Sequence, residues 1–215
     1  MKNINKIILI IIPIIAIILF FTFFLGSSDN LDEYNISIFE VENPNDDARS
    51  FTVMFNVDES KTENGAWAIL QLSPSYSFGV RFNNVTIPQN ATINNVYVEL
   101  YSIGTPGHLH PNCKIYCDDV NNSIDFSVYG VLNNSGRIYT TNYEYWNSTV
   151  SYGKWIKTPS ITSCITEVIS RSNWTSGNSI SILFVSEGIR GYASAFQNYE
   201  KGYPARLYLE WKESI

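Results

Sequence analysis

The sequence predicts an all-β protein: an antiparallel β-sandwich with one short crossover helix, preceded by an N-terminal transmembrane helix. Three observations lead there. Short stretches of alternating apolar and polar residues recur, with turn residues about every ten positions. Only one soluble segment has helical periodicity, and one 19-residue stretch near the N-terminus carries no charge. We therefore divide the chain into an anchor (1–26), a linker (27–35) and a sandwich domain (36–215).

The uncharged stretch, Ile7–Leu25, has the length of a membrane span, about 28 Å as a helix. Lys2 and Lys6 precede it and acidic residues follow, which predicts a cytoplasmic N-terminus and an extracellular domain. A cleaved signal peptide is the alternative, with cleavage near Gly26. Both readings export the domain. Seven N-x-S/T sequons are then candidate glycosylation sites: Asn35, Asn84, Asn90, Asn121, Asn133, Asn147 and Asn173.

The strands are read from alternation, and each is bounded by turn residues. The expected strands and extended pieces are 36–41, 51–57, 67–72, 76–82, 85–88, 93–102, 113–117, 126–131, two short strands within 139–155, 179–185, 192–196 and 205–211. Residues 43–50, which contain Pro44 and Asp46-Asp47, are expected to form a loop.

The expected helix lies in Thr158–Asn178. Ile161, Cys164, Ile165, Val168 and Ile169 fall on one helical face, so this face should cover a sheet. Thr158 is the expected N-cap, with Pro159 at the first helical position. Glu167 and Arg171 have the spacing of an ion pair. Trp174 is expected to close the end of the core, and Trp211 to lie in the core or at its end.

Four segments resemble, in order, a β-sandwich module of microbial cell-surface proteins. They are GVRFNNVTIPQNATINNVYVEL (79–100), KIYCDDVNNSIDF (114–126), TPSITSCITEVISRSNWTSGN (158–178) and ARLYLEW (205–211). The module is related to the DNRLRE and disaggregatase-related domains and to carbohydrate-binding module family 96. The resemblance implies a jelly-roll-like sandwich, a surface location and an adhesive or carbohydrate-binding role. It implies no catalytic residues.

Composition excludes one class of partner. The net charge is −6 and no basic patch is present, which argues against nucleic-acid binding. No nucleophile, zinc-protease or other catalytic motif occurs, so we expect no enzyme, although paired carboxylates of a glycan hydrolase converge only in space.

The best binding candidates are aromatic residues near the helix. Sugar rings stack on exposed aromatic faces, so Tyr143, Tyr145, Trp146 and Trp155 are predicted to contact a glycan. The alternative reading places the alternating members of this segment in the core. The leading functional hypothesis is a membrane-anchored, non-catalytic module that binds carbohydrate or mediates adhesion. The alternative is a structural envelope subunit that acts through protein–protein contacts.

Metal and thiol chemistry give weaker candidates. Asp118 and Asp119 lie in an oxygen-rich turn that could hold a structural calcium, and His108 and His110 form an H-x-H pair. No cofactor is otherwise expected. Cys113 and Cys117 on one strand would lie about 13 Å apart and cannot pair with each other. One of them could pair with Cys164 if the helix covers their strand, or all three could be buried free thiols.

Overall fold

The structure is a computed structural model that describes residues 33–51, 62–63, 70–73, 75–103, 109–128, 131, 136–187, 194–196 and 201–214. Residues 34–215 form one compact unit. The predicted membrane segment Ile7–Leu25 lies outside the described residues. Within the described ranges, no helix is long and apolar enough to cross a membrane.

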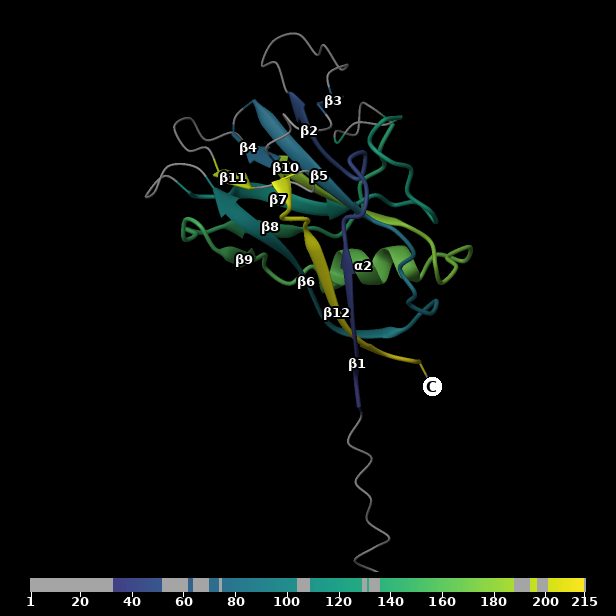
Figure 1. Cartoon of the computed structure of the whole chain (residues 1–215). Helices are drawn as coiled ribbons and strands as arrows, with labels where there is room; N and C mark the ends of the chain where they lie inside the picture. The colour runs from purple at the N-terminus through teal and green to yellow at the C-terminus, as the bar shows by residue number, and fades with distance from the viewer. Residues whose placement is uncertain are drawn as a thin grey trace, which may run out of the picture. The chain divides into compact units, whose positions relative to one another are not determined.

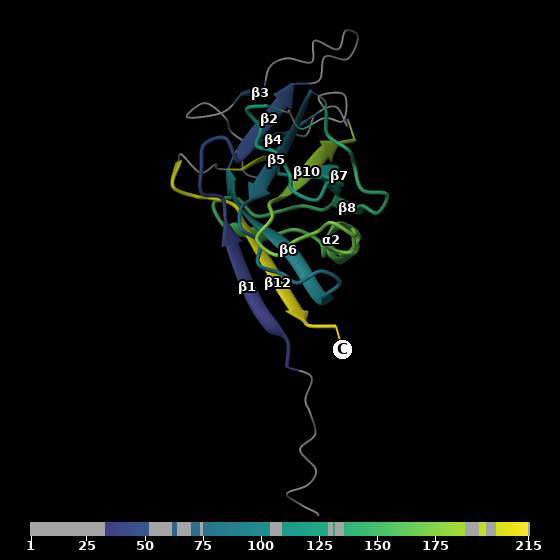
Figure 2. The same cartoon turned by 90° about the vertical axis from the view of Figure 1, so that its right-hand side faces the viewer.

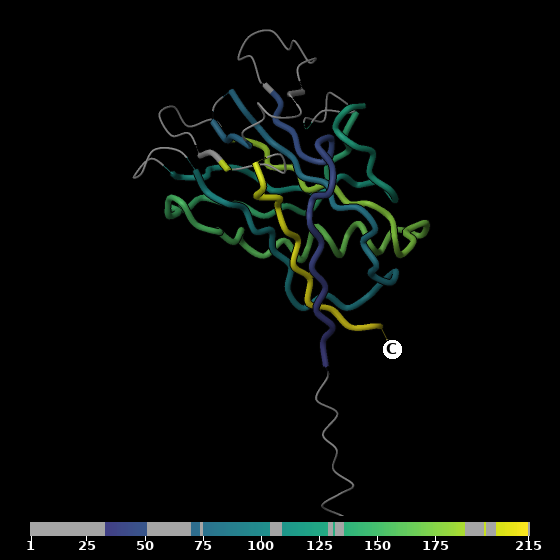
Figure 3. The backbone as a smooth tube through the Cα atoms, in the orientation of Figure 1, coloured from purple at the N-terminus to yellow at the C-terminus, as the bar shows by residue number. Residues whose placement is uncertain are grey.

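Two antiparallel sheets build the domain (Figure 1). The first has the order β1-β12-β6-β11-β4, with β9 also paired to β6. Its strands are β1 (Asn35–Glu40), β4 (Leu70–Leu72), β6 (Thr92–Ile103), β9 (Trp155–Lys157), β11 (Ser194–Phe196) and β12 (Arg206–Lys212). The first and last of these strands run side by side although they lie at opposite ends of the unit's sequence (Figure 3).

The second sheet has the order β3-β2-β5-β10-β7-β8. Its strands are β2 (Asp47–Phe51), β3 (Thr62–Glu63), β5 (Tyr76–Phe82), β7 (Asn112–Cys117), β8 (Glu144–Asn147) and β10 (Ile180–Ser186). Each hydrogen-bonded pair of strands in both sheets is antiparallel. The prediction of an antiparallel β-sandwich is therefore confirmed.

The main core lies between the sheets. Successive side chains of a strand point to opposite faces, so Val96, Val98 and Leu100 of β6 are buried while the residues between them are only half-buried. On the inner face of the second sheet, Phe78 of β5 stacks on its cross-strand partner Phe184 of β10 with ring centroids 4.3 Å apart. Burying such side chains supplies about 1.5–3 kcal/mol each toward folding.

A second, smaller apolar cluster covers the other face of β10. Phe126 and Val131, from the segment that follows β7, pack there with Ala48 and Leu183. Gly79 of β5 makes room for the Phe126 ring, because a Cβ at that position would lie 2.6 Å from the ring. β10 is thus buried on both faces, which explains its nearly continuous apolar sequence ISILFV.

The helix α2 (Thr162–Ile169) packs beside β6 and β7 (Figure 2). Its predicted buried face is confirmed, since Cys164, Ile165, Val168 and Ile169 are buried. Backbone bonds tie the entry of the helix to β6, from the Ile161 N–H to the Val96 carbonyl at 2.8 Å and from the Thr158 N–H to the Val98 carbonyl at 2.9 Å.

Details of the predicted helix are wrong. Ile161, not Thr158, occupies the N-cap position, and it makes no side-chain cap bond. The Thr158 hydroxyl instead accepts a bond from the Val98 N–H at 3.0 Å. Glu167 and Arg171 bind other partners, because each finds a closer group across the fold than along the helix. Trp174 is buried as predicted, and its indole N–H donates to the Ile87 carbonyl at 3.0 Å.

Most predicted strands appear within a residue or two of the expected positions, but two predictions are wrong. Residues 47–51 form β2 rather than a loop, because Asp46 is buried against Arg81 at 2.5 Å and fixes this chain beside β5. Phe126 begins a turn rather than a strand. Of the predicted strand 51–57, residues 52–57 lie outside the described residues, as do residues 67–69.

Candidate functional site

The predicted aromatic cluster is divided among three places. Trp146 lies in the core, 2% exposed, with its ring 5.6 Å from Phe196 and 6.2 Å from Phe184 between centroids. Its indole N–H donates to the Ser148 hydroxyl at 2.9 Å. A ring enclosed on its faces cannot stack on a sugar, so the prediction of a ligand contact is wrong for Trp146. The physical reason is strand alternation, which points Tyr145 and Trp146 to opposite faces of β8.

Tyr143 and Tyr145 lie on the outer side of the second sheet. They are 47% and 44% exposed. Tyr143 packs at 5.3 Å from Tyr116, which itself stacks on Tyr139 at 4.7 Å. The Lys114 ammonium lies 5.1 Å from the centre of the Tyr143 ring. These aromatic residues are accessible, but the Tyr145 hydroxyl is already engaged with the Asn112 side chain at 2.5 Å.

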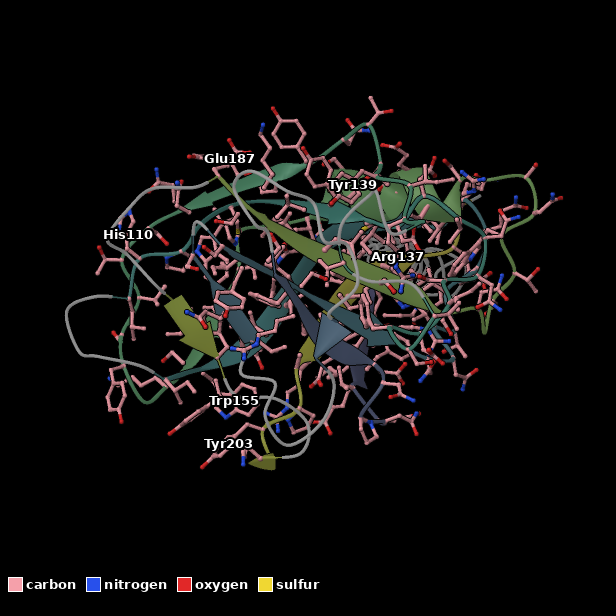
Figure 4. All side chains as sticks on the ribbon, turned by 90° about the horizontal axis from the view of Figure 1, so that it is seen from above. His110, Arg137, Tyr139, Trp155, Glu187 and Tyr203 are labelled. Carbon is pink, nitrogen blue, oxygen red and sulfur yellow. The ribbon has the colours of Figure 1, made fainter. Side chains whose placement is uncertain are left out.

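Trp155 lies on the outer face of the first sheet, within a group of aromatic residues from three segments. The ring of Tyr101 of β6 stacks on that of Tyr203 at 4.1 Å and meets Trp155 edge-on at 5.7 Å. Trp155 and Tyr203 lie together on one side of the domain, and Tyr139 lies on the opposite side (Figure 4). The guanidinium of Arg206 covers the Trp155 ring at 4.2 Å. We call Tyr101, Trp155, Tyr203 and Arg206 the β6 aromatic surface.

A row of alternating charges borders this surface. Cross-strand register aligns Glu40 of β1, Arg206 of β12, Glu99 of β6 and Lys157 of β9. Arg206 pairs with Glu40 at 2.7 Å, and Lys157 lies 3.9 Å from Glu99. These pairs are partly exposed, so each contributes little to stability. Their importance lies in fixing the orientation of Arg206 beside the aromatic rings.

Beyond the charged row is a second aromatic pair. Tyr97 of β6 stacks on Tyr208 of β12 at 4.6 Å. The ammonium of Lys157 covers the Tyr97 ring at 4.3 Å and donates to its hydroxyl at 2.8 Å. This hydrogen bond raises the pKa of Lys157, so the lysine is fully charged at neutral pH. The outer face of the sheet therefore combines partly exposed rings with fixed hydrogen-bonding groups.

A pattern in the sequence marks this surface. In VYVELY (96–101) and LYLE (207–210), tyrosines occupy the positions that alternate with buried aliphatic residues. Aromatic residues on the otherwise polar side of a strand mark an outer-face surface. Only Trp155 of this surface was predicted.

The predicted calcium ligands form ion pairs with arginines. Asp118 is buried against Arg137, 2.7 Å from its Nη1 atom, and accepts a bond from Ser123 at 2.7 Å. Asp119 pairs with Arg171 at 2.5 Å. A guanidinium thus occupies the place that a cation would take, so the prediction is corrected for both carboxylates. Across the described ranges, no three His, Cys, Asp or Glu side chains gather in a way that could hold a metal ion.

The histidine pair is only half described, because His108 lies outside the described residues. The His110 ring bonds the Asn147 side-chain oxygen at 2.6 Å and the Thr149 hydroxyl at 3.2 Å. This histidine therefore joins its own loop to the segment that follows β8.

The sequons mostly lie at accessible positions. Asn35, Asn84, Asn90, Asn147 and Asn173 are exposed. Asn84 and Asn90 have positive φ angles of 50° and 58°, which asparagine tolerates in turns. Asn121 is half-buried and accepts a bond from Arg171 at 3.0 Å, while Asn133 lies outside the described residues. Glycosylation at these sites stays a prediction.

Comparisons with known proteins add little to this picture. No family model matches the sequence. No curated protein matches it either. Among solved structures, the chain is weakly similar to mud crab tombus-like virus at 10% identity, over 89% of this chain and 98% of that one, with a TM-score of 0.23. A similarity of this size supports no conclusion about function.

Proposed function

We propose that this chain is a membrane-anchored, extracellular module that binds carbohydrate without catalysis. The observation that carries the proposal is the β6 aromatic surface. Sugar rings present C–H faces that stack on aromatic rings, and their hydroxyls bond to charged and polar groups beside those rings. Tyr101, Trp155 and Tyr203 offer the rings, and Arg206 with Glu40 offers a fixed donor and acceptor next to them.

The arrangement of this surface suits a binding function because its side chains are held in place. Three rings contact one another, and Arg206 is fixed by Trp155 on one side and by Glu40 on the other. Side chains that are already ordered lose little conformational entropy when a ligand binds. The rings lie on rigid strands and a short adjoining segment, and such a support keeps them in register with repeating sugar units.

The finer fold proposal is a jelly roll, as in the surface modules that the sequence resembles. The strand orders support it. β1-β12-β6-β9 in one sheet faces β5-β10-β7-β8 in the other, and the pairing alternates between early and late strands as in two interlocked Greek keys. In this proposal β2, β3, β4 and β11 are additions to the eight-strand arrangement.

A second function, in protein–protein contact, is favoured by one observation. Ile36 and Ile38 of β1 are 62% and 60% exposed on the same face as the aromatic surface. β1 ends its sheet in the order of the described strands. Exposed apolar residues on an edge strand are suited to pairing with another chain. An envelope or adhesion subunit would use this edge.

The experiment is a glycan array followed by titration of the best ligand with the full chain in detergent micelles. We expect Trp155→Ala to weaken binding at least about tenfold, or about 1.4 kcal/mol, and Trp155→Phe to retain part of it. Tyr143→Ala is the matched control, since it removes an exposed ring from the opposite sheet. Equal binding by wild type and Trp155→Ala would contradict the proposed site.

The protein-contact alternative has its own readout. Ile36→Lys with Ile38→Lys leaves the rings unchanged but places charges on the edge strand. A self-associating or partner-bound chain that dissociates with this change, while no glycan binds, would favour the structural function over the carbohydrate function.

A further inference from the structure

Two buried thiols meet where α2 packs against the second sheet. Cys164 lies on the buried face of α2, and Cys117 is the last residue of β7. Both are fully buried in the main core. The Cys164 sulfur lies 3.6 Å from the carbonyl oxygen of Ile115, two positions before Cys117 on β7, and each thiol affects the pKa of the other. They lie far apart along the chain and come together only through the fold.

Independent contacts fix both cysteines at the same point. The Cys164 sulfur lies 3.3 Å from the Asn142 carbonyl oxygen and 3.6 Å from the Ile115 carbonyl oxygen of β7. The Cys117 N–H donates to the Thr140 hydroxyl at 3.1 Å, and that hydroxyl donates to the same Asn142 oxygen at 2.8 Å. The helix, the end of β7 and the loop at 140–142 therefore converge on this pair of sulfurs.

The two thiols differ in acidity. The interaction with Cys117 lowers the pKa of Cys164, and a bond from Ser163 acts in the same direction against the effect of burial. Burial and the same contact raise the pKa of Cys117. Since the thiolate is the nucleophile in disulfide exchange, Cys164 is the attacking sulfur and Cys117 the resolving one.

We propose that Cys117 and Cys164 form a disulfide that fastens α2 to β7 when the chain folds in the presence of a small-molecule or protein disulfide. The Cys164 thiolate attacks one sulfur of the oxidant, forms a mixed disulfide and releases a thiolate. Cys117 loses its proton to that thiolate and attacks the Cys164 sulfur, which expels the second thiolate, and this thiolate takes up the proton that Cys164 released. The chain loses two protons and two electrons, and the oxidant becomes two thiols.

Cys113 provides an internal control for this proposal. It is buried on the same inward face of β7, opposite Trp146 of β8. Burial raises the pKa of Cys113 above its ordinary value. Cys117 lies four positions further along the strand, about 13 Å away, which exceeds what a disulfide can span. Cys113 is therefore expected to stay reduced where the other two react.

The disulfide would join residues that are distant in sequence. It would therefore reduce the conformational entropy of the unfolded chain and stabilise the fold. It lies in the core, whereas the β6 aromatic surface lies on the outer face of the first sheet. The proposal therefore does not rest on carbohydrate binding, and either can fail alone.

The test is refolding of the reduced full chain in a buffer of reduced and oxidised glutathione, followed by mass spectrometry. Trypsin separates the three cysteines, because Cys113 falls in peptide 82–114, Cys117 in 115–137 and Cys164 in 158–171. We expect a loss of two hydrogen atoms and one cross-linked species, 115–137 joined to 158–171. An unchanged mass, a cross-link that includes 82–114, a lasting glutathione adduct or a disulfide-linked dimer would each overturn the proposal.

Thermal unfolding adds a second readout. We expect oxidation to raise the unfolding midpoint of wild type and of Cys113→Ser, and to leave that of Cys117→Ser and Cys164→Ser unchanged. If a serine variant fails to fold, the peptide map of wild type still decides the pairing. A midpoint that rises equally in Cys164→Ser would contradict the proposal.

Discussion

Replacing Asp118 with asparagine removes one charge of a buried ion pair and leaves the other in place. The Asp118 carboxylate and the Arg137 guanidinium are 3% and 0% exposed and lie 2.7 Å apart. Arg137 also donates to the Ser123 hydroxyl at 2.8 Å and to the Asp125 carbonyl at 3.2 Å, and it covers the Phe126 ring at 4.6 Å. These contacts fix the guanidinium, so it cannot move to solvent when its anion is lost.

The expected loss of folding stability follows from the confinement of the Arg137 guanidinium. A buried charge that loses its partner destabilises a protein by about 3–5 kcal/mol. A domain of this size is stable by about 5–15 kcal/mol, so Asp118→Asn should lose a large part of the total. Asparagine has a single acceptor oxygen, so it can keep the bond from Ser123 or the bond from the Ile138 N–H but not both, since these donors use different oxygens of Asp118.

The assay is urea unfolding followed by tryptophan fluorescence, with Asp119→Asn as the matched control. Asp119 pairs with Arg171 in a partly exposed position, so its replacement should cost about 0–1 kcal/mol. Asp118→Leu combined with Arg137→Leu should lose less than Asp118→Asn alone. Equal losses in Asp118→Asn and Asp119→Asn would refute the reasoning. A calcium-dependent rise in stability that Asp118→Asn abolishes would show instead that Asp118 binds calcium.

Three further predictions concern other parts of the fold. Burial raises the pKa of Glu167, but bonds from the N–H groups of loop 141–142 outweigh this effect, and the pKa is lowered below 4.5. Wild type should therefore lose stability relative to Glu167→Gln as the pH falls below about 4.5, which thermal unfolding midpoints would measure. Gly79→Ala should cost about 1–3 kcal/mol, since its Cβ would overlap the Phe126 ring; a neutral change would contradict this packing. Trp146→Ala should cost about 3–5 kcal/mol in urea unfolding, whereas a loss below about 1 kcal/mol would indicate an exposed ring.

The strands could be predicted because alternation along a strand directly reflects which face is buried. Residues 76–82 were predicted with their exact boundaries, and the strand at 93–102 differs by one residue at each end. β2 was missed because Asp46 and Asp47 have the composition of a turn. Asp46 is buried because it pairs with Arg81, which is distant in sequence, so no local pattern reports its burial.

The candidate site was predicted less well, for a related reason. The residues chosen were neighbours in sequence, and strand alternation sends such neighbours to opposite faces. Trp146 entered the core, while Trp155 joined rings from β6 and from the segment before β12. Similarly, Phe126 was read as part of a strand from its apolar surroundings, but its ring fills the space above Gly79. Whether each of these side chains faces the core or the surface depends on contacts between segments that are distant in sequence.

The central claim is that the β6 aromatic surface binds carbohydrate, and its most direct measurement is the affinity of a double variant, Trp155→Ala with Tyr203→Ala. Titration of the best array ligand should show binding lost in this variant and unchanged in Tyr143→Ala with Tyr145→Ala, which removes two exposed rings from the other sheet. Both variants must keep the wild-type unfolding midpoint within a few degrees. Undiminished binding by the first variant, or loss confined to the second, would contradict the account.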